Sequence, residues 1–188
     1  MTKPELRKIY LQKRLALTDQ ECEALSQQIC DKFFSSIDLT HIKVIHTFLP
    51  IIKKNEPDTR LIIERLKKDF PHIKISIPKV VGNTLVNYFL DADCVLTENV
   101  WGVREPSNGN LTEPEEIDLV IVPLLAFDAT GHRVGYGKGF YDRFLKTCRQ
   151  DCMKVGISFF DCSAIEIDID EHDFLLTKSI TPATCFTF

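Results

Sequence analysis

The strongest constraint on the fold is the apolar run from Asp118 to Phe127, ten residues rich in Val, Ile and Leu. This length and this composition are typical of a strand that is buried on both faces of a sheet. A polar loop dense in glycine follows the run, and the residues from Tyr141 to Leu145 predict the first turns of a helix. A strand followed by a loop and a helix is the repeating unit of an α/β fold.

The loop of residues 128–139, called the glycine loop below, carries groups that bind an anion. Glycines let backbone N–H groups face a ligand without obstruction from a Cβ atom, and the start of the next helix adds partial positive charge. Arg133 and Lys138 add full charges, and Asp142 is an oxygen ligand suited to a magnesium ion on a nucleotide's phosphates. The glycines are Gly131, Gly135, Gly137 and Gly139.

Two common nucleotide-binding patterns do not describe this loop. No Ser or Thr follows Lys138, as a P-loop requires, and Phe140 stands where G-x-G-x-x-G needs its last glycine. A structural turn that needs positive φ explains one or two glycines. Because two cations and an acid accompany the glycines, anion binding is the favoured interpretation.

Strands and helices alternate along the chain, which predicts a single domain over residues 1–188 with a mainly parallel, twisted sheet flanked by helices (α/β, three-layer, Rossmann-like). The first helix, residues 2–17, has a stripe of Leu6, Ile9, Tyr10, Lys13 and Leu17. The other expected elements are a helix from a Thr18–Glu21 capping box to about Phe34, a strand Val44 to Leu49, a helix from Pro57–Asp58, strands Lys74 to Val80 and Leu85 to Leu90 around a Gly82–Asn83 turn, a polar connection Asp91 to Glu116, a strand Lys154 to Phe160, and one short C-terminal strand.

Ligands of such sheets bind at the carboxyl ends of the strands. The strand from Val44 is followed by Lys53, Glu56 and Asp58, and the central strand leads into the glycine loop. Trp101 and Glu105 lie in the long polar connection. The sequence therefore predicts one crevice that combines acids, a large aromatic ring and an anion site.

The segment from Asp118 to Arg143 resembles the signature of the 5-formyltetrahydrofolate cyclo-ligase (5,10-methenyltetrahydrofolate synthetase) family. The family pattern runs approximately D-hydrophobic-P-G-L-A-F-D-x-x-G-x-R-L-G-x-G-x-G-Y-Y-D-R, and this chain follows it closely. Two residues depart from it: Leu124 stands where the family usually has Gly, and Phe140 replaces the first Tyr of Tyr-Tyr-Asp.

Further landmarks of the family appear in the expected order along the chain. They are Lys-x-x-Leu-Arg at Lys3 to Arg7, Glu-x-Asp/Glu-Thr at Glu56 to Thr59, Gly-[Ile/Val]-x-Glu-Pro at Gly102 to Pro106, and His-Asp at His172–Asp173. Without the resemblance, Lys3 and Arg7 would be assigned to a solvated helix face. For Asp58 a helix cap and a ligand contact are equally open, and Trp101, in a polar loop with Gly and Pro, is favoured as a wall of the ligand site over packing.

The resemblance implies a role for each site residue. Nucleotide contacts are expected from Lys3, Arg7, Arg133, Val134, Gly135, Tyr136, Gly137, Lys138, Gly139, Phe140 and Tyr141. Folate contacts are expected from Lys53, Glu56, Asp58, Trp101, Glu105 and Tyr136. Magnesium is expected on Asp142 and Asp173, and the catalytic residues are expected to be Arg133, Lys138 and Asp142.

The reaction implied is ATP-dependent cyclisation of 5-formyltetrahydrofolate to 5,10-methenyltetrahydrofolate, with release of ADP and phosphate, through a phosphorylated formyl group (an iminophosphate). Its cofactors would be ATP and Mg²⁺. Two other interpretations stay open: an ATP-dependent kinase or ligase acting on another small acceptor, and a noncatalytic nucleotide- or RNA-binding relative.

Composition narrows the choice of partners. The net charge of −4 over 188 residues argues against nonspecific binding of nucleic acid. No run approaches the ~18 apolar residues of a membrane span, and the charged N-terminus lacks the core of a signal peptide. We therefore expect a cytoplasmic monomer with small-molecule partners, ATP and a reduced folate, and neither a nucleic-acid nor a membrane partner. The seven cysteines contain no C-x-x-C pair and are expected to be reduced thiols.

Overall fold

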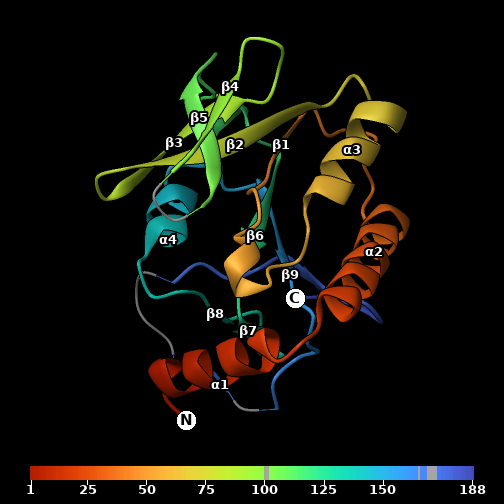
Figure 1. Ribbon diagram of the computed structural model, residues 1–188, viewed down its shortest axis with the longest axis vertical. Helices are drawn as coiled ribbons and strands as arrows, with labels where there is room; N and C mark the ends of the chain where they lie inside the picture. Colours follow the sequence, from red (N-terminus) through yellow and green to blue (C-terminus); the bar gives the residue numbers. More distant parts are fainter. Residues whose placement is uncertain (100–101, 165, 169–172) are drawn as a thin grey trace.

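The computed structural model describes residues 1–99, 102–164, 166–168 and 173–188. A seven-stranded sheet forms the centre of this structure (Figure 1). The strand order is β11-β10-β9-β6-β1-β2-β3. Neighbouring strands from β10 to β2 are parallel, whereas the edge strands β3 and β11 are antiparallel to their neighbours. The strands are β1 (Val44–His46), β2 (Lys74–Val81), β3 (Thr84–Phe89), β6 (Leu119–Pro123), β9 (Met153–Ile157), β10 (Lys178–Ile180) and β11 (Cys185–Thr187).

Helices cover both faces of this sheet, as Figure 1 shows: α2 (Asp19–Ser36) and α3 (Arg60–Asp69) on one side, α4 (Phe140–Leu145) on the other. Successive residues of a strand point to opposite faces. Ile121 of β6 accordingly belongs to one buried cluster with Phe33 of α2 and Leu66 of α3, while Val120 belongs to a second cluster with Phe144 of α4. Burial of each such side chain contributes roughly 1.5–3 kcal/mol. The predicted three-layer α/β fold is confirmed.

The first helix, α1 (Lys3–Leu15), contacts the segments that leave the carboxyl ends of the inner strands. These are η1 (Ile52–Lys54), β7 (Ala126–Phe127) and β8 (Arg133–Val134). A capping box between Thr2 and Glu5 starts the helix, and Leu6 packs with Ala126 and Val134. This end of the sheet therefore gathers α1, η1 and the glycine loop. None of the described helices is both long and apolar enough to cross a membrane.

The run from Asp118 to Phe127 is two strands, so the prediction of one continuous strand was wrong. After β6 the chain changes partner, and Leu125 N–H donates to Val134 O over 2.8 Å as β7 pairs with β8. Because Leu119 to Val122 and Leu124 to Phe127 are all buried, the apolar character of the run cannot reveal this change. Leu124, at the junction, is 2% exposed, and its Cδ2 would lie 2.5 Å from a Cβ at Gly156. The leucine thus fills space that the glycine of β9 leaves open.

A second difference lies in the expected polar connection from Asp91 to Glu116. It contains an antiparallel hairpin of β4 (Val95–Glu98) and β5 (Arg104–Asn108), followed by η2 (Pro114–Glu116). Within the two strands themselves only Pro106 is buried, so no alternation of apolar residues marks them.

The remaining boundaries differ little from expectation. The Thr18–Glu21 capping box and the Gly82–Asn83 turn are present, with Gly82 at φ +57°. The third helix starts at Arg60 rather than at Pro57–Asp58, because the Asp58 carboxylate accepts from the backbone N–H and the side chain of Arg60. β1 and β9 are shorter than predicted, and the C-terminal region has two strands, β10 and β11, where one was expected.

Candidate active site

Arg133, in β8 within the glycine loop, is held on two sides. Its guanidinium donates to the Asp142 carboxylate and to the Phe174 carbonyl, and the residue is only 9% exposed. The planar guanidinium makes both contacts at once. Arg133 and Asp142, expected to act together, are therefore in direct contact.

Arg7 of α1 reaches the glycine loop across 128 positions of sequence. Its Nε donates to Gly135 O over 2.8 Å, and a Cβ added at Gly137 would lie 2.8 Å from the Arg7 Cζ. Gly137 also has φ +80°, which side chains rarely adopt. Only glycine at this position lets the guanidinium lie against the loop backbone.

Lys3, at the start of α1, forms an ion pair with Asp173. The two side chains are 20% and 21% exposed, so solvent reaches both. The segment carrying Asp173 is anchored to the glycine loop: Leu176 N–H donates to Gly131 O over 3.0 Å. The fold therefore brings together the two ends of the chain that were expected to share a nucleotide.

The Asp128 carboxylate links Ile167 to the glycine loop. Its carboxylate accepts from the N–H groups of Thr130 and His132 in the loop, and from that of Ile167 over 2.9 Å. Burial acts to raise the pKa of Asp128, but these hydrogen bonds outweigh burial and hold its pKa below the ordinary value. Asp128 thus fixes Ile167 against the glycine loop.

The donor set fits a magnesium ion bound together with a nucleotide. In the described part of the chain, no group of three His, Cys, Asp or Glu side chains could hold a metal ion alone. Mg²⁺ in nucleotide sites keeps several waters and needs one or two carboxylates besides phosphate oxygens. Asp142 and Asp173 are partly exposed carboxylates of this kind, 31% and 21%, and each touches a cation.

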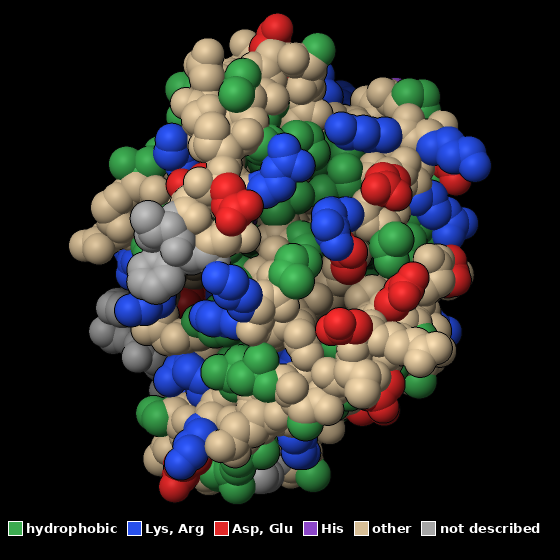
Figure 2. Space-filling view, viewed as in Figure 1, with side chains coloured by type: hydrophobic (Ala, Val, Ile, Leu, Met, Phe, Trp, Pro, Cys, Tyr) green, Lys and Arg blue, Asp and Glu red, His purple; other side chains and the backbone are tan. Residues whose placement is uncertain are grey.

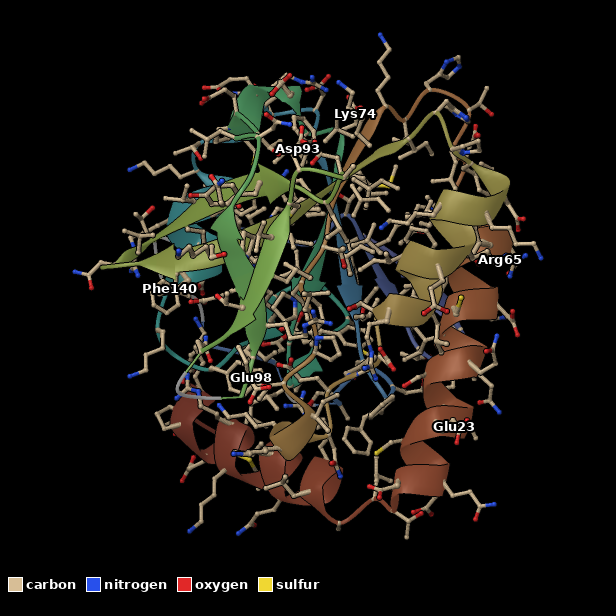
Figure 3. The ribbon with its side chains drawn as sticks, turned by 45° about the horizontal axis from the view of Figure 1, so that its top comes forward. Glu23, Arg65, Lys74, Asp93, Glu98 and Phe140 are labelled. Carbon is tan, nitrogen blue, oxygen red and sulfur yellow. The ribbon has the colours of Figure 1, made fainter. Side chains whose placement is uncertain are left out.

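The rest of the loop is set by packing around α4. Lys138 is exposed, and its carbonyl accepts from Arg143 over 2.9 Å. The same guanidinium lies 5.4 Å from the centre of the Phe140 ring, so the Phe that replaces the family's Tyr still offers an aromatic face (Phe140 is labelled in Figure 3).

Among the described residues the buried Tyr141 hydroxyl has no hydrogen-bond partner. Burial, followed by the nearby charge of Glu56, raises the pKa of Tyr141. Val134 is buried and pairs with Ala126.

Glu56 and Tyr136, two of the expected folate residues, are hydrogen-bonded to each other. The Tyr136 hydroxyl donates to Glu56 Oε1 over 2.5 Å, although 80 positions separate them. Burial raises the pKa of Glu56, and the N–H of Ile51, the Tyr136 hydroxyl, and Arg14 and Lys54 oppose this only in part. The pKa of Tyr136 is raised too, by burial and then by the charge of Glu56.

Arg14 is the residue of this site that the sequence pattern did not reveal. It is 3% exposed, and its Nη2 donates to the Tyr136 hydroxyl. The expected stripe on α1 included the exposed Lys13 and passed over Arg14, while the buried residues of the helix are Leu6 and Arg14. Arg14 stands four residues after Tyr10 and eight after Leu6, so a helical spacing that allowed a charged residue would have included it.

Gly102, in the connection between β4 and β5, lies near Glu98 of β4 and Lys53 of η1. A Cβ at Gly102 would be 3.7 Å from both Glu98 Oε1 and Lys53 Nζ, and Figure 3 shows Glu98 at the end of β4 that faces this region. Glu105 accepts from Asn99 over 3.1 Å. Asp58 forms an ion pair with Arg60 over 2.6 Å.

Trp101 and His172, which the sequence singled out, lie outside the described residues. On the face of the molecule shown in Figure 2, several Lys and Arg side chains lie above α1. The positive charge expected for an anion site is therefore present on this face.

Comparison with known proteins agrees with the residue pattern. The sequence pattern of the 5-formyltetrahydrofolate cyclo-ligase family matches residues 1–182. A 5-formyltetrahydrofolate cyclo-ligase of Mycoplasma genitalium is 33% identical over 93% of this chain and 94% of the relative. A second, of Escherichia coli K12, is 29% identical over 92% of this chain and 96% of the relative.

Solved structures show the same likeness in three dimensions. The NMR structure of 5,10-methenyltetrahydrofolate synthetase from Aquifex aeolicus superposes with a TM-score of 0.80 at 30% identity, covering 100% of this chain and 93% of that one. The synthetase structure from Mycoplasma pneumoniae gives 0.73 at 30% identity, covering 97% and 99%. The chain belongs to the 5-formyltetrahydrofolate cyclo-ligase family.

Proposed function

We propose that this chain uses ATP and Mg²⁺ to convert 5-formyltetrahydrofolate into 5,10-methenyltetrahydrofolate, releasing ADP and phosphate. Its family makes it a folate cyclo-ligase; the use of ATP, the metal and the phosphorylated intermediate are the proposal. One observation carries it: Tyr136 belongs to the glycine loop and yet donates to Glu56 over 2.5 Å. A nucleotide on the loop and a folate on Glu56 would therefore lie side by side. We further propose a cytoplasmic monomer whose residues 1–188 form one domain.

The nucleotide half of the site would use the cations and acids that the fold pairs. Lys3, Arg7, Arg133 and Lys138 would neutralise the triphosphate, and Asp142 and Asp173 would hold Mg²⁺. When bound, the metal would neutralise charge on the phosphate oxygens. Lys3 and Arg133 each form an ion pair with one of these two acids, so nucleotide binding would exchange ion pairs rather than expose new charge.

The folate half would use Glu56, Asp58, Lys53, Glu105 and Trp101 together with Tyr136. A buried carboxylate can accept from the N–H groups of a pterin, and an indole offers a face for stacking. Glu56 and Tyr136 already meet in the described part of the site.

In the proposed reaction the residues of the site orient the substrates and neutralise charge. A formamide oxygen is a poor leaving group, so the γ-phosphoryl group moves to it: a new P–O bond forms, the β–γ bridge breaks, and ADP is released. The neighbouring secondary amine then attacks the formyl carbon and loses its proton, while the C–O bond breaks and phosphate leaves. No side-chain nucleophile takes part. Arg133 and Lys138 would neutralise charge on the moving phosphoryl group, and Asp142 would contribute by holding Mg²⁺.

The decisive experiment is an ultraviolet assay with purified protein, 5-formyltetrahydrofolate, ATP and magnesium. We expect a new near-ultraviolet band, because methenyltetrahydrofolate absorbs there and the formyl compound does not. Omitting ATP, or removing magnesium with EDTA, is expected to abolish the band. If the protein binds ATP but never produces the band, the proposed reaction is wrong.

A pair of variants tests the division into two halves. Trp101→Ala should weaken folate binding by roughly 1–3 kcal/mol through loss of a stacking surface and leave ATP affinity almost unchanged. Lys138→Ala should do the reverse, because its ammonium group would face phosphate. Calorimetric titration of each ligand into each variant measures both effects. The division fails if both substitutions weaken the same ligand alone.

A further inference from the structure

We propose that Arg14 is a positioning residue for the folate half of the reaction: it fixes Tyr136 against Glu56 and places a positive charge beside this carboxyl group. The inference rests on the folate role proposed above for Glu56 and Tyr136. Nothing in the sequence pattern of the site includes Arg14, and its role follows from contacts that only the fold creates.

The guanidinium of Arg14 connects three other segments to α1. Its Nε donates to Lys54 O in η1 over 2.8 Å, its Nη1 to Leu124 O after β6 over 3.4 Å, and its Nη2 to the Tyr136 hydroxyl. The Asn55 side chain adds a bond back to the Arg14 carbonyl over 3.1 Å. Three acceptors in different directions match the fixed fork of a guanidinium, which a lysine cannot reproduce.

Tyr136 transmits this positioning to Glu56. Its hydroxyl accepts from Arg14 and donates to Glu56 Oε1, while Glu56 Oε2 accepts from Ile51 N–H over 2.7 Å. Both carboxyl oxygens therefore accept a hydrogen bond, as suits an ionised carboxylate. With Glu56 only 7% exposed, its charge depends on these neighbours.

Among the described residues, charged and titratable groups from four segments act on Glu56 or respond to its charge. They are Arg14 from α1, Lys54 from η1, Tyr136 from the glycine loop and Tyr141 from α4. Burial raises the pKa of Glu56, and Arg14 and Lys54 are the cations that oppose the rise. Removing the charge of Arg14 must therefore raise this pKa further, so that Glu56 becomes protonated at a higher pH.

The test compares Arg14→Gln, which removes the charge, with Arg14→Lys, which keeps the charge and loses the fork. The quantity measured is kcat/KM for 5-formyltetrahydrofolate against pH, at saturating ATP and magnesium. For Arg14→Gln we expect at least a ~10-fold loss, the worth of a hydrogen bond to a charged group, and an acid limb shifted to higher pH. For Arg14→Lys we expect a loss without that shift. The KM for ATP should change less than ~2-fold in both, since no phosphate contact is altered.

Two controls separate positioning from general damage. Lys13→Gln removes a neighbouring charge on α1 that lies 4.8 Å from the centre of the Tyr10 ring, and should leave the acid limb in place. In a Tyr136→Phe background, Arg14→Gln should add less than ~2-fold to the loss in kcat/KM, because the link to Glu56 is already broken. A purely structural Arg14 would instead give equal losses in both backgrounds and no shift of the limb, which would overturn the inference.

A binding measurement keeps the test independent of the proposed reaction. Calorimetric titration of 5-formyltetrahydrofolate without ATP, across the same pH range, should show the same shift for Arg14→Gln. If the wild-type protein gives no near-ultraviolet band, the proposed reaction fails while this titration still decides the role of Arg14. An unchanged pH dependence of binding in Arg14→Gln contradicts the inference whatever the turnover.

Discussion

Replacing Asp142 with Asn is expected to lower turnover at least ~100-fold, since electrostatic stabilisation of a developing charge commonly carries such factors. The substitution keeps the shape of the side chain and removes its charge, so magnesium loses one of its two expected ligands. Asn retains an oxygen that can accept from Arg133, which donates to Asp142 in the native protein. The thermal midpoint should therefore change little. Steady-state rates at increasing magnesium concentration, with a thermal melt of each protein, measure both expectations.

Asp151→Asn is the matched control for Asp142→Asn. Asp151 also pairs with an arginine, Arg149 over 3.1 Å, but its side chain is 77% exposed and lies outside the site. This variant should keep wild-type turnover and magnesium dependence. If Asp142→Asn unfolds, or if it keeps full activity, Asp142 has a structural role at the start of α4 and is not a metal ligand.

The sequence predicted the parts of this fold that depend on local signals. The Thr18–Glu21 capping box and the turn at Gly82 are set by residues within a few positions of each other, and both appear in the structure. The mainly parallel sheet followed from the order of apolar segments, because alternation of strands and helices permits few other arrangements. The residues of the glycine loop could also be identified from the sequence, because they are consecutive.

Contacts between distant segments explain what the sequence did not predict. Arg14 is buried only because η1, the end of β6 and Tyr136 meet above α1, and no local pattern marks a buried arginine. The β4–β5 hairpin has strands with little burial, so hydrophobic periodicity is silent there. The ion pair between Lys3 and Asp173 joins the two ends of the chain. The expected site residues were thus named from a pattern, while the pairs they form needed the structure.

Gly135 and Gly137 of the glycine loop allow the same substitution, Gly to Ala, to be compared at two positions. Gly135 has no atom within 4 Å of an added Cβ, whereas Gly137 has φ +80° and would place its Cβ 2.8 Å from Arg7 Cζ. An alanine at Gly137 strains the backbone by about 1–2 kcal/mol and pushes the guanidinium away from the loop. Sterically this shift is cheap, since the guanidinium ends a flexible side chain, but it removes a cation expected to face phosphate.

Gly137→Ala is therefore expected to weaken ATP binding ~100-fold or more, the combined effect of a strained loop and a lost charged hydrogen bond. Gly135→Ala, the matched control, should bind ATP within ~3-fold of wild type, because neither clash nor positive φ opposes it. Calorimetric titration of ATP into both variants measures the difference, and a folate titration checks that the neighbouring half is intact. Equal ATP affinities in the two variants would mean that the loop can rearrange freely and that Arg7, which lies against Gly137, does not contact the nucleotide. A loss of ATP affinity confined to Gly137→Ala would assign Gly137, and the Arg7 side chain that lies against it, to the nucleotide half of the site.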